Sequence, residues 1–222
     1  MYQPKQFDVS DAANLHAALR AHPLGTLVTL QDGELVADEV PFFLDATPSA
    51  EHPLGVLKAH VARANPLWQR HDPAHKVLVV FKGPQAYVSP SWYATKAEHG
   101  KVVPTWNYIV VQASGHMTHK DGDASWLRAQ LDAMTHSQEG QREAPWAVSD
   151  APAEYIAQTM KAIVGIEIPI ATLLGKWKVS QNQPAPNREG VVRGLTETAL
   201  STPDSVASAV AQAVLDRSPA AT

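Results

Sequence analysis

Hydrophobic and polar residues alternate along much of this chain with the period of two that is typical of β-strands. Such patterns cover residues 26–45, 56–63, 76–90, 102–119 and 166–180. The first of these segments is interrupted by Asp32-Gly33, a dipeptide that tolerates the positive φ angles of a tight turn, so it predicts a β-hairpin. Pro104 cannot donate to a strand ladder, and we expect it at an edge or bulge.

Helical spacing is confined to fewer segments. A first helix is predicted between a cap at Asp8 or Ser10 and a stop at Pro23, and a brief helix follows Asn65-Pro66. Two longer helices are expected over residues 123–134 and 150–165, with Gly165 ending the second. An Ala-rich helix is expected over residues 202–218, after an irregular connector at 181–190.

The order of these elements predicts the fold class. Strands follow one another in antiparallel hairpin order and the helices are peripheral, which indicates a mainly β fold, a small barrel or curved sheet with helices around it. The regular alternation of strand and helix that marks a parallel doubly wound fold is missing from the sequence. We expect one domain over residues 1–195 and a helical, loosely docked or partner-packed tail over 196–222.

Composition narrows the chemistry. The chain has 222 residues, 45% of them hydrophobic and only 18% charged, and so few charges favour a dimer that buries part of its surface. The lack of cysteine excludes disulfides, zinc-thiolate sites and a cysteine nucleophile. A net charge of -4 disfavours a large surface for DNA phosphates. With neither a signal peptide nor a membrane-spanning run, we expect a soluble cytoplasmic protein.

Common catalytic motifs do not occur. The ten histidines are badly spaced for a metal: His116 and His119 fall on opposite faces of a predicted strand, and Pro73 separates His71 from His75. We therefore expect no metal site. There is no G-x-S-x-G, no phosphate loop and no G-x-G-x-x-G, and no catalytic residue is assigned.

Three dense polar-aromatic segments remain, at residues 59–66, 87–108 and 175–182. Each combines a cation with hydroxyl or amide groups, a mixture that suits a flat, partly apolar ligand carrying a phosphate. The residue types alone leave other roles open. Trp92, Tyr93 and Trp106 equally suit a hydrophobic core, and Asn65 suits a helix cap. Arg63 and Lys178, taken singly, suit a solvated surface.

These segments also carry a family resemblance. GVLKAHVARANPLW (55–68), GPQAYVSPSWYATKAEHGKVVPTWNY (83–108) and GKWKVSQN (175–182) closely resemble the PaiB-type FMN-binding negative transcriptional regulators. The resemblance extends from about residue 1 to residue 195 in the family's order and spacing. One departure is QASGHMTH (112–119), where a bulkier aromatic residue is expected before the glycine, and it affects only local packing.

The resemblance implies an FMN-binding split β-barrel, related to pyridoxamine-phosphate oxidases and flavin reductases, that forms a homodimer with FMN near the subunit interface. It places the FMN phosphate and ribityl chain at His60, Ala62, Arg63 and Asn65. The other residues that it implies at the FMN site are Ser91, Trp92, Tyr93, Lys96, Thr105, Trp106, Asn107, Trp177, Lys178 and Gln181.

What the protein does with FMN stays open at this point. The resemblance implies a regulator, but the segment QEGQREAPWAV between two predicted helices is far longer than the turn of a helix-turn-helix. DNA binding therefore rests on the resemblance alone. The alternatives are an FMN-dependent oxidoreductase or flavin reductase acting on a small substrate, and a barrel that has lost FMN and serves as a binding module.

Overall fold

The computed structural model describes residues 1–47, 49–202 and 206–217. The chain divides into two compact units. Unit 1 consists of Met1–Asp11, Lys82–Val111 and Leu174–Thr222, and unit 2 of Ala12–Phe81 and Gln112–Leu173. Unit 1 is thus built from three stretches of sequence that lie far apart along the chain.

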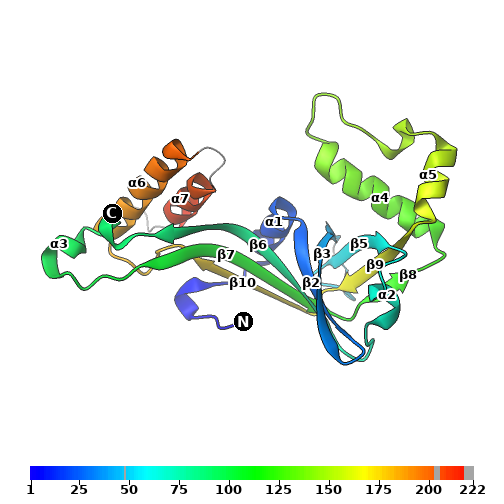
Figure 1. Ribbon diagram of the computed structural model, residues 1–222, viewed down its shortest axis with the longest axis horizontal. Helices are drawn as coiled ribbons and strands as arrows, with labels where there is room; N and C mark the ends of the chain where they lie inside the picture. Colours follow the sequence, from blue (N-terminus) through cyan, green and yellow to red (C-terminus); the bar gives the residue numbers. More distant parts are fainter. Residues whose placement is uncertain (48, 203–205, 218–222) are drawn as a thin grey trace. The chain divides into compact units, whose positions relative to one another are not determined.

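Unit 2 contains the predicted hairpin. Strand β2 (Leu24–Gln31) pairs antiparallel with β3 (Glu34–Pro41) along its whole length, as Figure 1 shows. Asp32 and Gly33 form the turn with φ angles of 52° and 88°, which confirms the prediction made from this dipeptide. On its other side, β2 pairs with residues 78–81 of β6 (Val77–Val88).

A second, four-stranded sheet completes the β-structure of unit 2. Its order is β4 (Phe43–Asp45), β5 (Val56–Ala62), β9 (Ile163–Pro169) and β8 (Thr118–Lys120). All its pairs are antiparallel. Alternate residues of β5, Leu57, Ala59 and Val61, are buried, as are Ile166 and Ile168 of β9, so one face of this sheet supplies much of the core.

The helices of unit 2 are α1 (Ala12–Ala21), α2 (Leu67–Arg70), α4 (Ala124–Glu139) and α5 (Ala153–Met160), with a 3₁₀ turn η3 (Val148–Asp150) before α5. Leu15 and Leu19 bury the apolar face of α1, and Asp123 caps α4 by accepting the backbone N–H of Trp126. The cap predicted at Asp8 was wrong, because Asp8 belongs to β1 and α1 begins only at Ala12. Asn65 accepts the backbone N–H of Leu67 and so caps α2.

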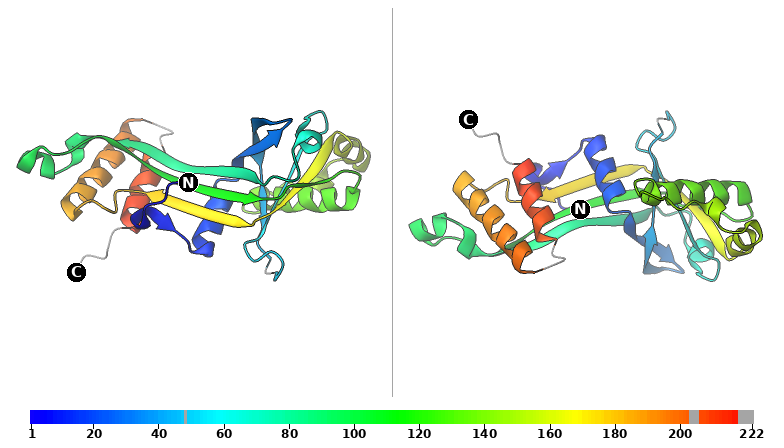
Figure 2. Two further views of the ribbon diagram at one scale, coloured as in Figure 1. Left: turned by 90° about the horizontal axis from the view of Figure 1, so that it is seen from below. Right: turned by 90° about the horizontal axis from the view of Figure 1, so that it is seen from above.

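Unit 1 contains the parts of β6, β7 (Thr105–Gly115) and β10 (Thr172–Lys178) that fall within Lys82–Val111 and Leu174–Thr222. β10 lies between β7 and the short β1 (Asp8–Val9), which follows the 3₁₀ turn η1 (Lys5–Phe7). Between β6 and β7 the chain forms η2 (Pro90–Trp92) and α3 (Thr95–His99). Helices α6 (Ala185–Ser201) and α7 (Ala207–Asp216) lie side by side in Figures 1 and 2.

Trp92 is held by α6. A Cβ added to Gly194 would lie 2.3 Å from the Trp92 ring, and one added to Gly190 would lie 1.9 Å from the Trp92 carbonyl oxygen. The two glycines, one helical turn apart, therefore form a groove that admits η2. This close packing explains why a segment with two glycines is helical, although glycine disfavours helices by about 1 kcal/mol per residue.

Several predicted boundaries were wrong. The strand pattern at 102–119 divides into β7 and β8, and the pattern at 166–180 divides after Pro169. The helix expected to continue to Gly165 ends at Met160, and residues 163–165 belong to β9. Gly165 is needed there for another reason, because the Trp126 ring lies 2.3 Å from where its Cβ would be.

The connector expected at 181–190 was also wrong, because α6 begins at Ala185. Thr202, expected to cap the tail helix, follows the end of α6, and the tail helix α7 begins only at Ala207. The predicted helix positions 203–205 and 218 lie outside the described residues. The division of the chain at residue 195 stays a prediction.

The fold class expected from the sequence, mainly β with peripheral helices, is confirmed by the two antiparallel sheets and the helices around them. Among the residues that the structure describes, no helix has the length and apolar character needed to cross a membrane.

The α6 groove gives a stability prediction. Gly190→Ala should lower the free energy of unfolding by about 1–3 kcal/mol, the usual cost of overpacking, because the new methyl meets backbone that cannot rotate away. The measurement is urea unfolding followed by circular dichroism. Glu189→Ala, at the neighbouring exposed position, is the control and should change little. An unchanged or raised stability of Gly190→Ala would contradict the packing described.

Candidate functional site

Unit 1 contains a polar cavity of about 380 Å³, within the range of small-molecule sites. Residues from α3, the loop before β7, the start of β7, the end of β10 and the start of α6 line it. Its walls are mixed: Tyr93, Val102, Val103 and Pro184 supply ring and aliphatic surface, while Lys101, Thr105, Asn107, Lys178 and Ser180 supply polar groups.

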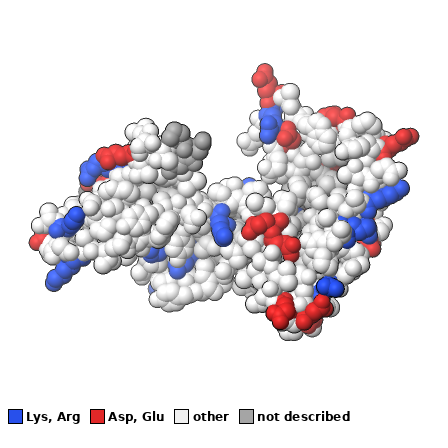
Figure 3. Space-filling model, viewed as in Figure 1, with Lys and Arg blue, Asp and Glu red and all other residues white. Residues whose placement is uncertain are grey.

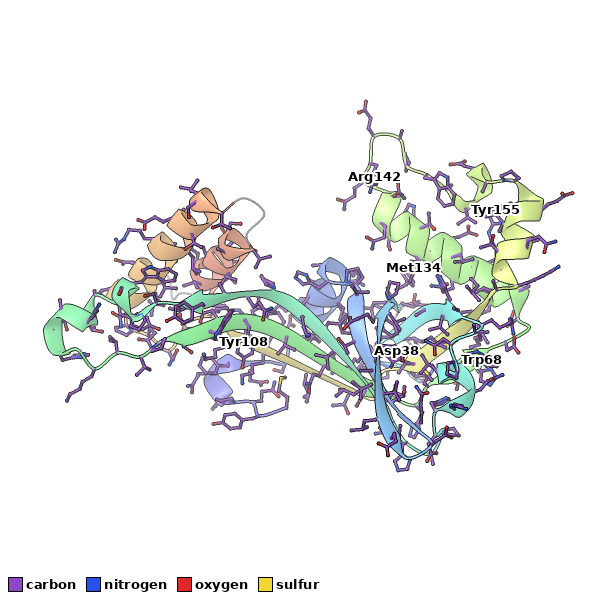
Figure 4. The ribbon with its side chains drawn as sticks, in the orientation of Figure 1. Asp38, Trp68, Tyr108, Met134, Arg142 and Tyr155 are labelled. Carbon is purple, nitrogen blue, oxygen red and sulfur yellow. The ribbon has the colours of Figure 1, made fainter. Side chains whose placement is uncertain are left out.

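Lys178 is the central cation of this cavity. Its Nζ donates a hydrogen bond to the Trp106 carbonyl at 2.6 Å and another to the Thr105 hydroxyl. Burial lowers the pKa of Lys178; Tyr108 acts in the opposite direction and Lys176 lowers the pKa further. Both ammonium groups lie near the Tyr108 ring, at 5.9 Å and 5.5 Å from its centroid, and Figure 4 labels Tyr108 on β7. A bound anion would therefore stabilise the charged form of Lys178.

A buried hydrogen-bonded pair fixes the floor beside Lys178. Asn107 is 1% exposed and Ser180 3%. The Asn107 amide donates to the Ser180 hydroxyl at 2.9 Å, and that hydroxyl lies 3.3 Å from the Asn107 oxygen, to which it can donate in turn. Ser180 has a φ of 63°, an uncommon conformation for a residue other than glycine that often occurs at functional sites.

The start of α6 is bound to the opposite wall. Asn187, 2% exposed, donates to the Thr95 hydroxyl at 3.0 Å and accepts the Thr95 backbone N–H at 3.1 Å. It also donates to the Gln183 side-chain oxygen at 3.1 Å. Because all three residues line the cavity, these bonds hold its two sides at a fixed separation.

The electrostatic character of the cavity is one-sided. Lys101, Lys178 and His99 line it, and none of the described residues that line it is acidic. Burial raises the pKa of Tyr93, so its hydroxyl stays neutral and can donate or accept a hydrogen bond at physiological pH. The cavity is suited to an anion that also carries a ring and polar edges.

Four of the predicted site residues belong to unit 2 instead. Ala62 ends β5, and His60 on the same strand has its Nδ1 3.0 Å from the Gln130 side-chain oxygen. Asn65 donates to Asp38 Oδ1 at 3.0 Å, and Figure 4 labels Asp38 and Trp68 in this unit. Asp38 Oδ2, beside Asn65, is buried without a hydrogen-bond partner among the described residues. A hydrogen-bond donor on a ligand could pair with this oxygen.

Arg63 has several partners within unit 2. Its guanidinium donates to Asp121 Oδ1 at 2.8 Å, to the Lys161 carbonyl at 2.7 Å and to the Ile163 carbonyl at 3.3 Å. It also lies 5.9 Å from the centroid of the Trp68 ring. A guanidinium has five N–H donors, so two are left for a further acceptor, and its charge is already partly balanced by Asp121.

The structure brings Tyr93, Thr105, Asn107 and Lys178 together in the unit 1 cavity. The other six predicted residues of unit 1 do not line it and contact other parts of the unit instead. Lys96 donates to the Ser91 hydroxyl, Trp92 packs on α6, and the Trp106 ring makes an edge contact with Tyr87. Trp177 lies under the Arg217 guanidinium, and the side chain of Gln181 binds backbone groups around the turn after β10.

Sequence reasoning missed several lining residues. Ser180 and Asn182 lie inside the motif GKWKVSQN, where attention to the hydroxyl and amide would have found them. Asn187 was missed because its segment was interpreted as an irregular connector. Lys101 and His99 lie within the middle motif without any spacing that singles them out. No group of three or more metal-ligating side chains is found in the part of the chain that the structure describes.

Comparisons with known proteins agree with this picture. Residues 1–172 match the family described as "Putative FMN-binding domain". The protease synthase and sporulation protein PAI 2 of Bacillus subtilis is 30% identical over 195 residues, which cover 88% of this chain and 89% of that protein. An uncharacterised protein of Emericella nidulans is 36% identical over 211 residues, covering 81% of this chain and 84% of its own.

Solved structures share the fold at low sequence identity. A conserved hypothetical protein of Mycobacterium tuberculosis aligns with a TM-score of 0.55 at 13% identity, covering 83% of this chain and 94% of that one. The FAD and heme binding protein of Mycobacterium smegmatis aligns with a TM-score of 0.52 at 18% identity, covering 77% and 73%. At such identities the likeness concerns the fold alone.

The buried pair of the cavity can be tested by substitution. Asn107→Ala should lower the free energy of unfolding by about 1–3 kcal/mol, because it leaves the Ser180 hydroxyl buried without a partner. Ser180→Gly should cost less, since glycine adopts a positive φ without strain. Thermal unfolding of both variants measures the difference. Equal losses would show that relief of strain at position 180 does not offset the loss of the Ser180 hydroxyl as the partner of Asn107.

Proposed function

The chain belongs to the FMN-binding domain family that its residues 1–172 match, and we propose that it acts as a cytoplasmic, homodimeric, FMN-binding negative transcriptional regulator of the PaiB type. The observation that carries the flavin part of this proposal is the cationic cavity of unit 1, with Lys178 at its centre and no acidic residue among the described residues that line it. FMN is an anion with a flat ring and a polar edge, which are the features that this cavity accommodates.

The residues present fit FMN in type. Lys178 and Lys101 would donate hydrogen bonds to the oxygens of its ring, Thr105 and Asn107 would hydrogen-bond to polar edges, and Tyr93 would contact ring surface. His60, Ala62, Arg63 and Asn65 of unit 2 are the proposed contacts of the phosphate and ribityl chain. Ser91, Trp92, Lys96, Trp106, Trp177 and Gln181 complete the proposed set, and for Trp92 and Gln181 the contacts described above favour a supporting role.

When bound, the isoalloxazine of FMN supplies reversible hydride and electron transfer. The chain's own residues bind and orient it. The lowered pKa of Lys178 makes its proton sensitive to a nearby negative charge, and the raised pKa of Tyr93 keeps a neutral hydroxyl at the cavity wall. Lys178 and Tyr93 line the same cavity as Thr95 and Gln183, which Asn187 holds to α6.

Regulation of transcription is supported by the relationship to PAI 2 of Bacillus subtilis, whose name refers to protease synthesis and sporulation. Direct reading of DNA has less support in this chain. The net charge is -4, and acidic and basic residues are interspersed over the face shown in Figure 3. We therefore propose that control of transcription passes through FMN-dependent contact with DNA or with a protein partner.

The second candidate is an FMN-dependent oxidoreductase or flavin reductase acting on a small substrate. The observation that favours it is the connection between α4 and α5, residues 140–152 with η3 inside it, which lacks the short turn of a helix-turn-helix. Without such a turn between α4 and α5, a bound flavin would be expected to serve redox chemistry.

One experiment separates the two functions. Oxidation of NADH and NADPH is measured with and without FMN, beside salt-dependent binding to the promoter region of the chain's own gene. A regulator should bind that DNA specifically, with a dissociation constant on the order of 10⁻⁸ M, and show no turnover. Turnover that requires FMN, without specific DNA binding, would instead favour the oxidoreductase.

Lys178 provides the test of FMN binding. Lys178→Met should weaken FMN binding about tenfold to a hundredfold, the usual effect of one hydrogen bond to a charged group. Quenching of flavin fluorescence gives the affinity. Lys82→Met, at an exposed position of β6, is the matched control and should leave the affinity unchanged.

The pH dependence follows from the same residue. Because the pKa of Lys178 is lowered by burial, its charge is present at neutral pH and is lost as pH rises through that lowered value, below that of an ordinary lysine. FMN affinity should fall over this alkaline range in the wild-type protein. Lys178→Arg keeps its charge there, so its affinity should stay constant over the same range. The proposed role of Lys178 fails if both proteins show the same pH profile.

A further inference from the structure

Unit 2 contains a second cavity, of about 410 Å³, and Arg63 is the one proposed FMN contact that lines it. It lies where β5 ends, between the segment that leads from β8 into α4 and the segment that leads from α5 into β9. Leu127 of α4, Ala157 and Met160 of α5, and Ile163 of β9 form an apolar lining. The interior is therefore suited to an aliphatic or aromatic group.

Helix α5 has an incomplete apolar contact beside this cavity. None of its residues is buried, although Ile156, Ala157 and Met160 give it an apolar face. An amphipathic helix is normally stabilised by packing that face against another group. An apolar ligand in the cavity would cover Ala157 and Met160 and so complete the packing of α5.

Three cations line the same cavity: Arg63, Lys120 and Lys161. Figure 3 shows Lys and Arg side chains gathered near β8 and the end of α5. Arg63 is paired with Asp121 at 2.8 Å, and Lys120 with Glu167 at 3.2 Å. The Lys161 ammonium has neither an ion pair nor a hydrogen bond among the described residues, so its charge is the one left for a ligand.

Asp123 is the acidic residue that lines the cavity, and it already has partners. Its carboxylate accepts the backbone N–H of Trp126 and the hydroxyl of Ser125. These hydrogen bonds lower the pKa of Asp123, so it remains ionised as the cap of α4. Cations still outnumber acidic groups around the cavity, and a negatively charged ligand is favoured over a positive one.

We propose that this cavity binds a small amphipathic carboxylate, with its apolar tail between α4 and α5 and its carboxylate at Lys161. A purely apolar molecule would leave the Lys161 charge unused, and inorganic phosphate would leave the apolar lining uncovered. The site shares no lining residue with the unit 1 cavity, and Arg63, the proposed FMN contact that lines it, is already paired with Asp121. The ligand would act on the protein by stabilising α5.

Decanoate is the probe, titrated into the full chain by isothermal titration calorimetry, with decanol as the uncharged analogue. Decanoate should bind with a stoichiometry of about one per chain. Lys161→Gln should weaken decanoate about tenfold, as expected for one lost charge-assisted hydrogen bond, and leave decanol unchanged. Lys76→Gln, an exposed lysine of the same unit, is the matched control and should have no effect.

A second variant tests the apolar part. Ala157→Trp places a large ring into the cavity from an exposed position, and it should abolish binding of both decanoate and decanol. Ala153→Trp, on the same helix but outside the cavity lining, should bind both normally. Circular dichroism confirms that each variant is folded. Equal affinities of the two tryptophan variants, or equal effects of the two lysine variants, would overturn the proposal.

Titration with FMN keeps this proposal separate from the flavin site. FMN affinity should be unchanged in Lys161→Gln and Ala157→Trp, and decanoate should bind equally to protein with and without FMN. If FMN displaces decanoate competitively, the cavity is part of the flavin site and the proposal of a separate carboxylate site fails. Failure of FMN to bind at all, with decanoate binding intact, would remove the flavin proposal and leave this one standing.

Discussion

The polar contacts of unit 1 are arranged around the partly desolvated ammonium group of Lys178. Taking a cation out of water is unfavourable unless acceptors surround it, and here the first two residues of β7 supply a hydroxyl and a carbonyl. The next residue, Asn107, then fixes Ser180 two positions beyond Lys178. The ends of β7 and β10 are thus held together by polar contacts at the point where a ligand would bind.

Around this point tight packing adds to the hydrophobic core of the unit, to which Val191, Leu195 and Val210 of its last two helices contribute. Trp92 occupies the glycine groove of α6, and Asn187 ties the first turn of α6 to Thr95. Both contacts are specific in geometry. A methyl group on either glycine would clash with Trp92, and a polar side chain shorter than Asn187 would not reach Thr95. The same helix therefore closes the cavity and limits how far its walls can move.

How much could be predicted depended on whether the signal was local. Asp32-Gly33 and the Asp123 cap act within a few residues, so the hairpin and the start of α4 were predicted correctly, whereas α4 continues to Glu139 beyond the predicted end at 134. Helix α6 was missed because its glycines and prolines argue locally against a helix, and only contact with Trp92 explains it. Lys178 and Thr105 were predicted from the family resemblance, whereas Ser180 gains its importance from a backbone conformation that no residue pattern reveals.

The division of unit 1 among three stretches of the chain affects its folding during synthesis. Its cavity combines residues of the middle stretch with Lys178, Ser180 and Asn187 of the last stretch, and these follow the end of the family match at residue 172. During synthesis from the N-terminus, β7 leaves the ribosome after its neighbour β6 but long before its other neighbour β10 exists. The edge of β7 and the aromatic side chains of β6 and β7 stay exposed until the last fifth of the chain has been made. A nascent protein of this design is most vulnerable to aggregation during this interval.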